Sequence, residues 1–253
     1  MEFFYIRQNL IEKFEKLFIT IVGMGGFRIE RLKLNGETKF LPLTLFWAFC
    51  IILSFVGAML ITELYHLQGA LIYFGASWVF YYIGNTIILT TNFRFKVIDN
   101  FGEETAYRLY EVIIGLMFAH QALAFGAIVE ENWFAWPSFA ELGVIDEVGL
   151  LFIVIGFVVK TWATMIVGLD TYYYKDMFLS KVTGSFAVVG PYKLFNNPMY
   201  GIGNLQLYGF ALFYFSISGL VIALLLHISI YAFYYFAEKP AVVKLYGKTG
   251  YND

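Results

Sequence analysis

Two sets of polar side chains recur at helical spacing near the C-terminus of a largely apolar sequence. Members of each set lie three or four positions apart: Asn197, Tyr200, Asn204 and Tyr208 in the first, and His227, Tyr231, Tyr234 and Glu238 in the second. This spacing places each set on one face of a helix. Amides, phenols and a carboxylate together offer hydrogen bonds and one negative charge to a polar ligand.

The position of these side chains separates two interpretations. A polar side chain in hydrocarbon is costly unless it is paired or faces water. Bonding between neighbouring helices, with tyrosines at the membrane interface, accounts well for Tyr208 and Tyr231. Asn197, Tyr200 and Glu238 stand at the two ends of one long apolar tract. For these three we favour a binding site where water meets lipid.

The composition indicates an integral membrane protein. Hydrophobic residues make up 60% of the chain, charged residues 14%, and the mean hydropathy is +0.68. These values lie outside the range of soluble globular domains. The single cysteine, Cys50, excludes a disulfide within the chain. We expect neither a metal site nor a nucleic-acid partner, and the sequence does not indicate an oligomeric state.

Long apolar runs predict an all-α, polytopic membrane bundle of about six spans. Helices are expected at 41–64, 70–91, 109–129 and 148–169, and a hairpin at 199–237 that breaks near Ser216, Ser218 and Gly219. Residues 2–22 have the pattern of an amphipathic helix that lies on the membrane surface. The expected organisation is an N-terminal segment 1–40, four spans within 41–169, and a C-terminal unit 170–253.

Basic residues test the order of these spans. Sixteen of the seventeen Lys and Arg residues fall in segments 1–40, 92–108, 170–198 and 238–253, which alternate with segments that have none. The positive-inside rule then places both termini in the cytoplasm, in a multi-pass protein of the inner-membrane or endoplasmic-reticulum type.

Lys160, His120 and Gln121 are among the polar residues inside the predicted spans. Lys160 either extends its stem towards the surface or forms a structural pair, or it belongs to a site. His120 and Gln121 are most simply explained as hydrogen-bonding groups between helices.

Three stretches carry a family resemblance. They are DTYYYKDMFLSKVTGSF (170–186), GPYKLFNNPMYGIG (190–203) and, after the apolar hairpin, AEKPAVVKLYG (237–247). Together they resemble the phospholipid N-methyltransferases, which are related to the isoprenylcysteine carboxyl methyltransferases within one superfamily of membrane methyltransferases. The run NPMY at 197–200 is typical of phosphatidylethanolamine methyltransferases. The sequence departs from their pattern at Asp170, where a second glycine is usual after Gly168, and at Lys239, where a second glutamate is usual.

The resemblance implies transfer of methyl groups from S-adenosylmethionine to phosphatidylethanolamine or its partly methylated derivatives, towards phosphatidylcholine, at the cytoplasmic interface. The cofactor-binding residues that it implies are Gly168, Tyr192, Asn197, Pro198, Met199, Tyr200, Gly201, Gly203, Asn204, Tyr234 and Glu238. Glu238 would hold the ammonium or the ribose hydroxyls of the cofactor. Tyr172, Tyr173, Tyr174 and Lys193 would contact the lipid, although the tyrosines equally suit interfacial anchoring.

A protonated amine cannot attack, so a proton acceptor is needed. The candidates are Asp170, Asp176 and His227. The two aspartates could instead be solvated residues at helix ends, and the histidine a hydrogen-bonded core residue.

Two other functions stay open. A related methyltransferase could act on another acceptor, such as a prenylcysteine carboxylate or a small lipophilic thiol or amine. A transporter or scaffold is the third possibility, but it would be expected to gather its polar residues near the middle of the membrane and to show repeat symmetry.

Overall fold

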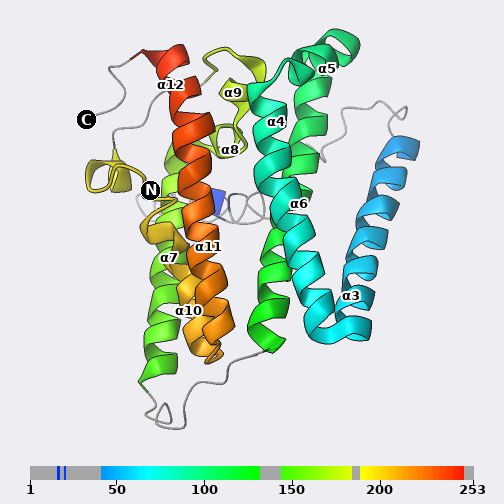
Figure 1. Cartoon of the computed structure of the whole chain (residues 1–253). Coiled ribbons are helices and arrows are strands. Elements are labelled where there is room, and N and C mark those ends of the chain that lie inside the picture. The colour runs from blue at the N-terminus through cyan, green and yellow to red at the C-terminus, as the bar shows by residue number, and fades with distance from the viewer. Residues whose placement is uncertain (1–15, 18–19, 21–40, 132–143, 184–188, 248–253) are drawn as a thin grey trace, which may run out of the picture.

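The fold is a bundle of helices. The computed structural model describes residues 16–17, 20, 41–131, 144–183 and 189–247, and every regular element within these ranges is helical (Figure 1). This confirms the predicted all-α class. The predicted amphipathic helix at 2–22 lies almost entirely outside the described residues.

The first two predicted spans form one antiparallel pair. Helix α3, Leu41–Trp78, turns sharply at His66, whose φ of 45° is left-handed, and the chain then reverses direction (Figure 1). Gly69 makes this turn possible, because a Cβ there would lie 2.2 Å from the carbonyl oxygen of Ile61. The second arm continues through the π-helical segment η2, Val79–Gly84, into α4, Asn85–Thr90.

Two further long helices complete the predicted set of four. After α5, Phe93–Phe101, helix α6 covers Glu103–Glu131 and α7 covers Ile145–Val167. Helix α7 ends at Gly168, whose φ of 82° stops the helix, and the short helices α8, Leu169–Tyr172, and α9, Lys175–Leu179, follow.

The C-terminal hairpin breaks where the sequence predicts. Helix α10, Leu205–Phe213, is joined to α11, Ile217–Phe233, at Ser216, whose hydroxyl caps α11 by accepting a hydrogen bond from the backbone N–H of Gly219 at 3.0 Å. Helix α11 continues through the π-helical segment η6, Tyr234–Glu238, into α12, Lys239–Tyr246.

The first arm of the hairpin is shorter than predicted. Gly190–Lys193 and Ile202–Asn204 form only 3₁₀ turns, η4 and η5, and α-helix begins at Leu205. Pro198 and the glycines at 201 and 203 explain this, because both residue types disfavour the interior of an α-helix. The nine residues of α10 extend about 14 Å, which is less than half the hydrocarbon thickness of ~30 Å.

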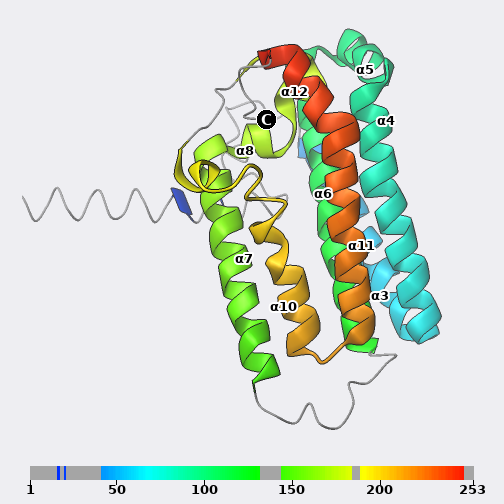
Figure 2. The same cartoon turned by 60° about the vertical axis from the view of Figure 1, so that its left-hand side comes forward.

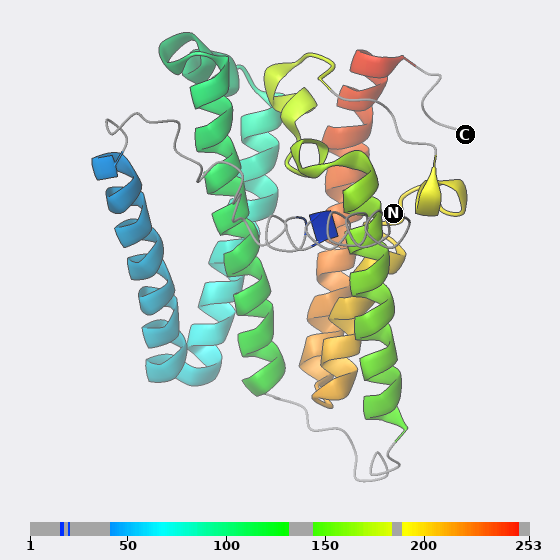
Figure 3. The same cartoon turned by 180° about the vertical axis from the view of Figure 1, so that it is seen from behind.

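Helix α10 is held in the bundle by close packing on α7. A Cβ on Gly156 would lie 2.4 Å from the backbone nitrogen of Gln206, and one on Gly209 would lie 2.6 Å from the carbonyl oxygen of Gly149. Such small residues let helix backbones approach closely within a membrane. Figures 2 and 3 show α10 between α7 and α11.

Within the described residues, four helices are long and apolar enough to cross a membrane, namely Gln68–Thr90, Glu103–Glu131, Ile145–Val167 and Ile217–Tyr246, and a shorter apolar helix covers Ile52–His66. The chain is therefore an integral membrane protein. Helices α5, α8, α9 and α12 all lie at one end of the bundle, hereafter the α12 end (Figures 1 and 3). The turns at His66 and Ser216 lie at the opposite end, which agrees with the predicted alternation of basic segments.

Candidate functional site

The two polar sets meet through Tyr200. Its hydroxyl donates a hydrogen bond to Oε2 of Glu238 at 2.7 Å, and its backbone N–H donates to Oδ1 of Asn197 at 3.3 Å. Tyr200 is buried, and its ring packs edge-on against that of Tyr234 with centroids 6.1 Å apart. Folding of the hairpin therefore brings together, near the α12 end, residues that are about forty positions apart in the sequence.

A second tyrosine extends this contact. The hydroxyl groups of Tyr174 and Tyr200 lie 3.1 Å apart and share a hydrogen bond. Tyr174 adopts the left-handed region with φ of 56°, an unusual conformation for a bulky residue. Burial raises the pKa of both phenols well above the ordinary value, and the nearby Glu238 carboxylate raises them further. Both groups therefore stay protonated, and because the single proton of Tyr200 goes to Glu238, Tyr174 donates to the Tyr200 oxygen.

These residues border an internal cavity of about 470 Å³. Its walls come from η2, α6, α7, α8, α10 and α11, and they are mostly apolar. Seven predicted site residues line it: Tyr172, Tyr173, Tyr174, Met199, Tyr200, Asn204 and Glu238. The volume falls within the range of sites for small organic ligands. Two π-helical segments contribute Tyr81, Tyr82 and Glu238 to the wall, and such segments recur at functional sites.

Lys160 lines the same cavity. Its side chain is buried at 8% exposure, and its ammonium donates to Oδ1 of Asn204 at 3.3 Å and lies 5.5 Å from the ring centre of Phe118. Of the interpretations offered from the sequence, the structure favours a contact inside the bundle over extension to the surface. The sequence features that could have predicted this contact were a lysine inside an apolar span and an asparagine in the segment just before α10.

His120 and Gln121 differ in their surroundings. His120 is bonded to the hydroxyls of Ser54 at 3.0 Å and Tyr73 at 2.8 Å, which confirms its predicted role between helices. Gln121 is buried and lines the cavity, and neither its amide nitrogen nor its amide oxygen has a hydrogen-bond partner among the described residues. For Gln121 the prediction of a bond between helices is therefore not met.

Other predicted cofactor residues serve the hairpin itself. A Cβ on Gly203 would lie 3.2 Å from Cβ of Lys160, and one on Gly201 would lie 3.2 Å from the Tyr231 hydroxyl. Pro198 is fully buried. The two glycines let the segment approach α7 and α11, which is a packing reason for residues that the sequence assigned to cofactor binding.

Tyr192 and Lys193 lie outside the cavity lining. Lys193 is exposed in η4. The Tyr192 hydroxyl is buried and has no partner among the described residues. Burial raises the pKa of Tyr192, and the Glu238 carboxylate adds to the rise. A buried phenol without a partner is a donor available to a ligand.

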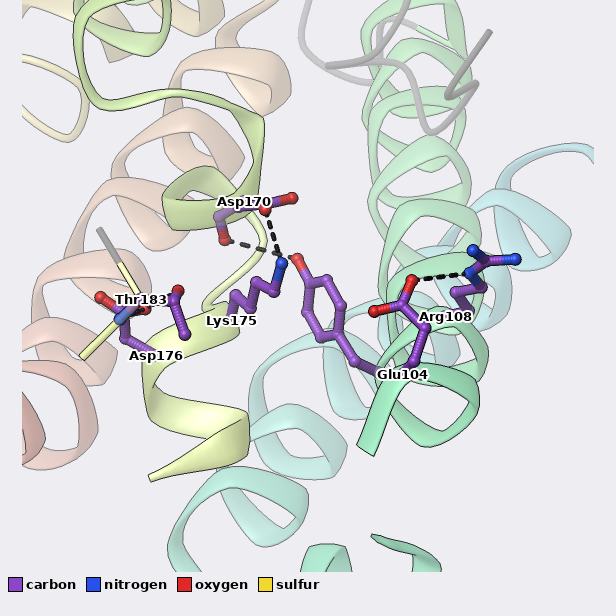
Figure 4. A network of polar contacts seen from close by, with 7 residues as sticks. Glu104, Arg108, Asp170, Lys175, Asp176 and Thr183 are labelled. Carbon is purple, nitrogen blue, oxygen red and sulfur yellow. Dashed lines mark hydrogen bonds and ion pairs between the residues drawn. The ribbon is translucent and has the colours of Figure 1, made fainter. Parts of the chain in front are cut away.

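The structure gives the two aspartate candidates structural contacts. Asp170 forms an ion pair with Lys175 at 2.8 Å, and Figure 4 shows the lysine directed at it. Asp176 is buried, accepts from the backbone N–H of Thr183 at 3.0 Å, and also accepts from the hydroxyls of Thr183 and Tyr246. Asp176 thus ties the segment after α9 to α12.

The histidine candidate also lies elsewhere. Nδ1 of His227 is hydrogen-bonded to the Tyr208 hydroxyl at 3.0 Å, and its ring stacks on Tyr231 at 5.4 Å. This matches the alternative explanation of His227 as a hydrogen-bonded residue and of Tyr208 as a hydrogen-bonding group between helices, whereas Tyr231 contributes a ring contact. Among the described residues that line the cavity, none is Asp170, Asp176 or His227. The geometry therefore does not support any of the three as the proton acceptor.

An apolar helical bundle with an internal cavity that is polar near one end has the architecture of a membrane protein with a ligand site in its core. Residues 144–249 match the family model described as phospholipid methyltransferase, which confirms the predicted resemblance over α7 to α12. The match extends before the first of the three stretches that carry the resemblance and takes in the whole of α7.

Curated relatives agree with this. The chain is 30% identical over 117 residues to a phosphatidylethanolamine N-methyltransferase of Schizosaccharomyces japonicus, covering 46% of this chain and 13% of the relative. It is 33% identical over 93 residues to one of Meyerozyma guilliermondii, covering 36% and 11%. The aligned part is thus about an eighth of the length of these relatives. No solved structure shows significant similarity to the chain.

Proposed function

We propose that this chain transfers methyl groups from S-adenosylmethionine to the amine of phosphatidylethanolamine or its partly methylated derivatives, towards phosphatidylcholine, at the cytoplasmic face of a membrane. The observation that carries the proposal is the hydrogen bond between the buried Tyr200 and the partly buried Glu238 on the wall of a mostly apolar cavity. The match of residues 144–249 to the phospholipid methyltransferases supports the chemistry.

The residues at the α12 end fit the methyl donor. S-adenosylmethionine would supply a methyl group activated by a sulfonium. Glu238 offers a carboxylate oxygen to an ammonium or to ribose hydroxyls, because Tyr200 donates to only one of its two oxygens in the described structure. Tyr192 offers the buried hydroxyl described above. The rings of Tyr174 and Tyr200 border the same region and can stabilise a cation.

The protein contributes mainly by positioning the reactants. In-line displacement needs the lipid nitrogen and the donor carbon aligned at contact distance, and such alignment supplies a large part of the acceleration. The attacking nitrogen must first lose a proton. The apolar lining favours this loss, because a low-dielectric site destabilises a charged ammonium next to a cationic donor. The apolar part of the cavity would hold the acyl chains within the bundle while the headgroup reaches Tyr200.

The test is the lipid content of a host that lacks methylated phosphatidylethanolamine. Expression of the full chain should produce mono-, di- or trimethylated lipids, whereas Glu238→Gln should produce far less at equal protein level. Binding of S-adenosylhomocysteine without any methylated phosphatidylethanolamine would point to another acceptor. Absence of both binding and product would contradict the proposal and favour a transporter or scaffold.

A further inference from the structure

The cavity changes character along its length, from the α12 end inwards. Glu238 directly precedes α12, and hydrogen bonds join it to Tyr200 and Tyr200 to Tyr174, so all three border the cavity at its α12 end. Asn204, which accepts from the Lys160 ammonium, lies in η5 just before α10, so Lys160 lines the cavity on the α10 side of Tyr200. Beyond Lys160 the lining residues of α6, α7 and α10 are largely apolar and aromatic: Phe125, Val129, Phe157, Leu207 and Phe210.

The charge on Lys160 lacks an anionic partner within the described structure. No carboxylate among the described residues lies within 4.0 Å of its ammonium, and one hydrogen bond, to Asn204, uses one of its three N–H donors. A buried cation without a counter-charge is costly in a membrane-embedded bundle. An anion that enters the cavity would remove this cost.

Two further polar groups face the cavity near the same depth without partners in the described residues. They are both amide atoms of Gln121, a residue with 7% exposure, and Oε1 of Gln206. Gln121 lies on α6 one turn beyond Phe118, whose ring is in contact with the Lys160 ammonium. Its N–H₂ group can donate to an ester carbonyl, because a carboxamide offers two donors.

We infer that Lys160 binds the phosphodiester of the acceptor lipid, that Gln121 binds an ester carbonyl next to it, and that the two residues hold the lipid amine beside Tyr174 and Tyr200, next to the donor site at Glu238. This inference rests on the proposed function, for which it names the headgroup site. From the α12 end inwards, the phenols, the cation and the apolar wall follow the order amine, phosphate and acyl chain of phosphatidylethanolamine.

The carboxylate of the methyl donor is the competing anion. The surroundings of Lys160 favour the lipid, because the ammonium packs on Phe118 and the wall beyond it is apolar. The polar donor molecule, with its ribose and base, needs hydrogen-bonding partners on most sides. Acyl chains need none.

The experiment measures binding of short-chain phosphatidylethanolamine to the purified full chain in detergent micelles, by calorimetry, separately from turnover. Lys160→Met should raise the Kd at least roughly 10-fold, since it removes a charged hydrogen bond, while Lys160→Arg should stay within about threefold. Lys244→Met is the control, because it removes an exposed lysine of α12 outside the cavity. S-adenosylhomocysteine should bind all four proteins equally.

A second measurement uses the unaltered chain and needs no variant. The ligand is an analogue whose phosphodiester is methylated to a neutral triester. The unaltered chain should bind this analogue as weakly as Lys160→Met binds the natural lipid. The affinity of Lys160→Met for the analogue should be no lower than that of the unaltered chain. Equal affinity for the charged and neutral lipids would overturn the inference. So would loss of S-adenosylhomocysteine affinity in Lys160→Met, which would assign the ammonium to the donor's carboxylate.

These outcomes are separable from the proposed function. Charge-dependent lipid binding without methyl transfer would leave the headgroup site standing and refute the activity. Methyl transfer with unchanged lipid affinity in Lys160→Met would refute the site and leave the activity.

Discussion

The substitution Glu238→Gln probes the binding of the methyl donor. It keeps the size of the side chain and an oxygen that can accept from Tyr200 at 2.7 Å, but it removes the negative charge. A hydrogen bond to a charged group contributes about 1.5 to 3 kcal/mol. At 1.4 kcal/mol per tenfold change in Kd, the affinity for S-adenosylhomocysteine should fall roughly 10- to 100-fold.

The assay is calorimetric titration of purified variants, with thermal unfolding as a check on the fold. Tyr208→Phe is the matched control on the same hairpin, because it removes the bond to His227 outside the cavity lining. Its affinity should stay within about twofold of the unaltered chain. Unchanged affinity in Glu238→Gln, or an equal loss in Tyr208→Phe, would refute the assignment of Glu238 to the donor site.

Three further predictions concern residues outside the cavity or behind its wall. Asp176→Asn should lower the free energy of unfolding by about 1 to 3 kcal/mol, because the carboxylate accepts a hydrogen bond from Tyr246. Turnover per folded molecule should be unchanged. A large loss of turnover at full stability would restore Asp176 as a catalytic residue. Asp170→Asn should change neither turnover nor stability by more than about 1 kcal/mol, as expected for a partly exposed ion pair, and lipid assays plus thermal unfolding measure both. Gly156→Val should lower the unfolding temperature and the activity together, because the new Cβ would clash with the backbone of Gln206 where α10 packs on α7. An unaltered unfolding temperature would count against this packing.

The membrane spans could be predicted because each depends on local sequence. A run of about 20 apolar residues defines a span without reference to its neighbours. Ser216 and Gly219 marked the break of the hairpin for the same reason, since a helix cap is a local feature. The short first arm was less evident, because Pro198 and nearby glycines interrupt helix inside a tract that is still apolar.

The site was only partly predictable because its walls come from distant helices. The contact of Tyr200 with Glu238 followed from the hairpin alone. Gln121 and Lys160 reach the cavity from α6 and α7, and no periodicity relates their positions to those of the hairpin. The π-helical turns that carry Tyr82 and Glu238 are likewise set by packing rather than by local propensity.

The candidate proton acceptors show a different limit of prediction from sequence. Asp170 and Asp176 have the right chemistry and lie near the right membrane face, but a sequence does not show which partner a carboxylate finds. In the fold, Asp170 forms an ion pair with Lys175, and Asp176 accepts hydrogen bonds from Thr183 and Tyr246. A residue type at the right end of a helix is therefore weaker evidence than a contact between two elements.

The most direct test of the account uses defined components. The purified chain, reconstituted in vesicles of phosphatidylethanolamine, is given S-adenosylmethionine with a deuterated methyl group, and the lipids are analysed by mass spectrometry. The account predicts phosphatidylethanolamine carrying one to three deuterated methyl groups, with the yield strongly reduced in Glu238→Gln and unaffected in Tyr208→Phe. Unlabelled lipid in the presence of bound donor would contradict it.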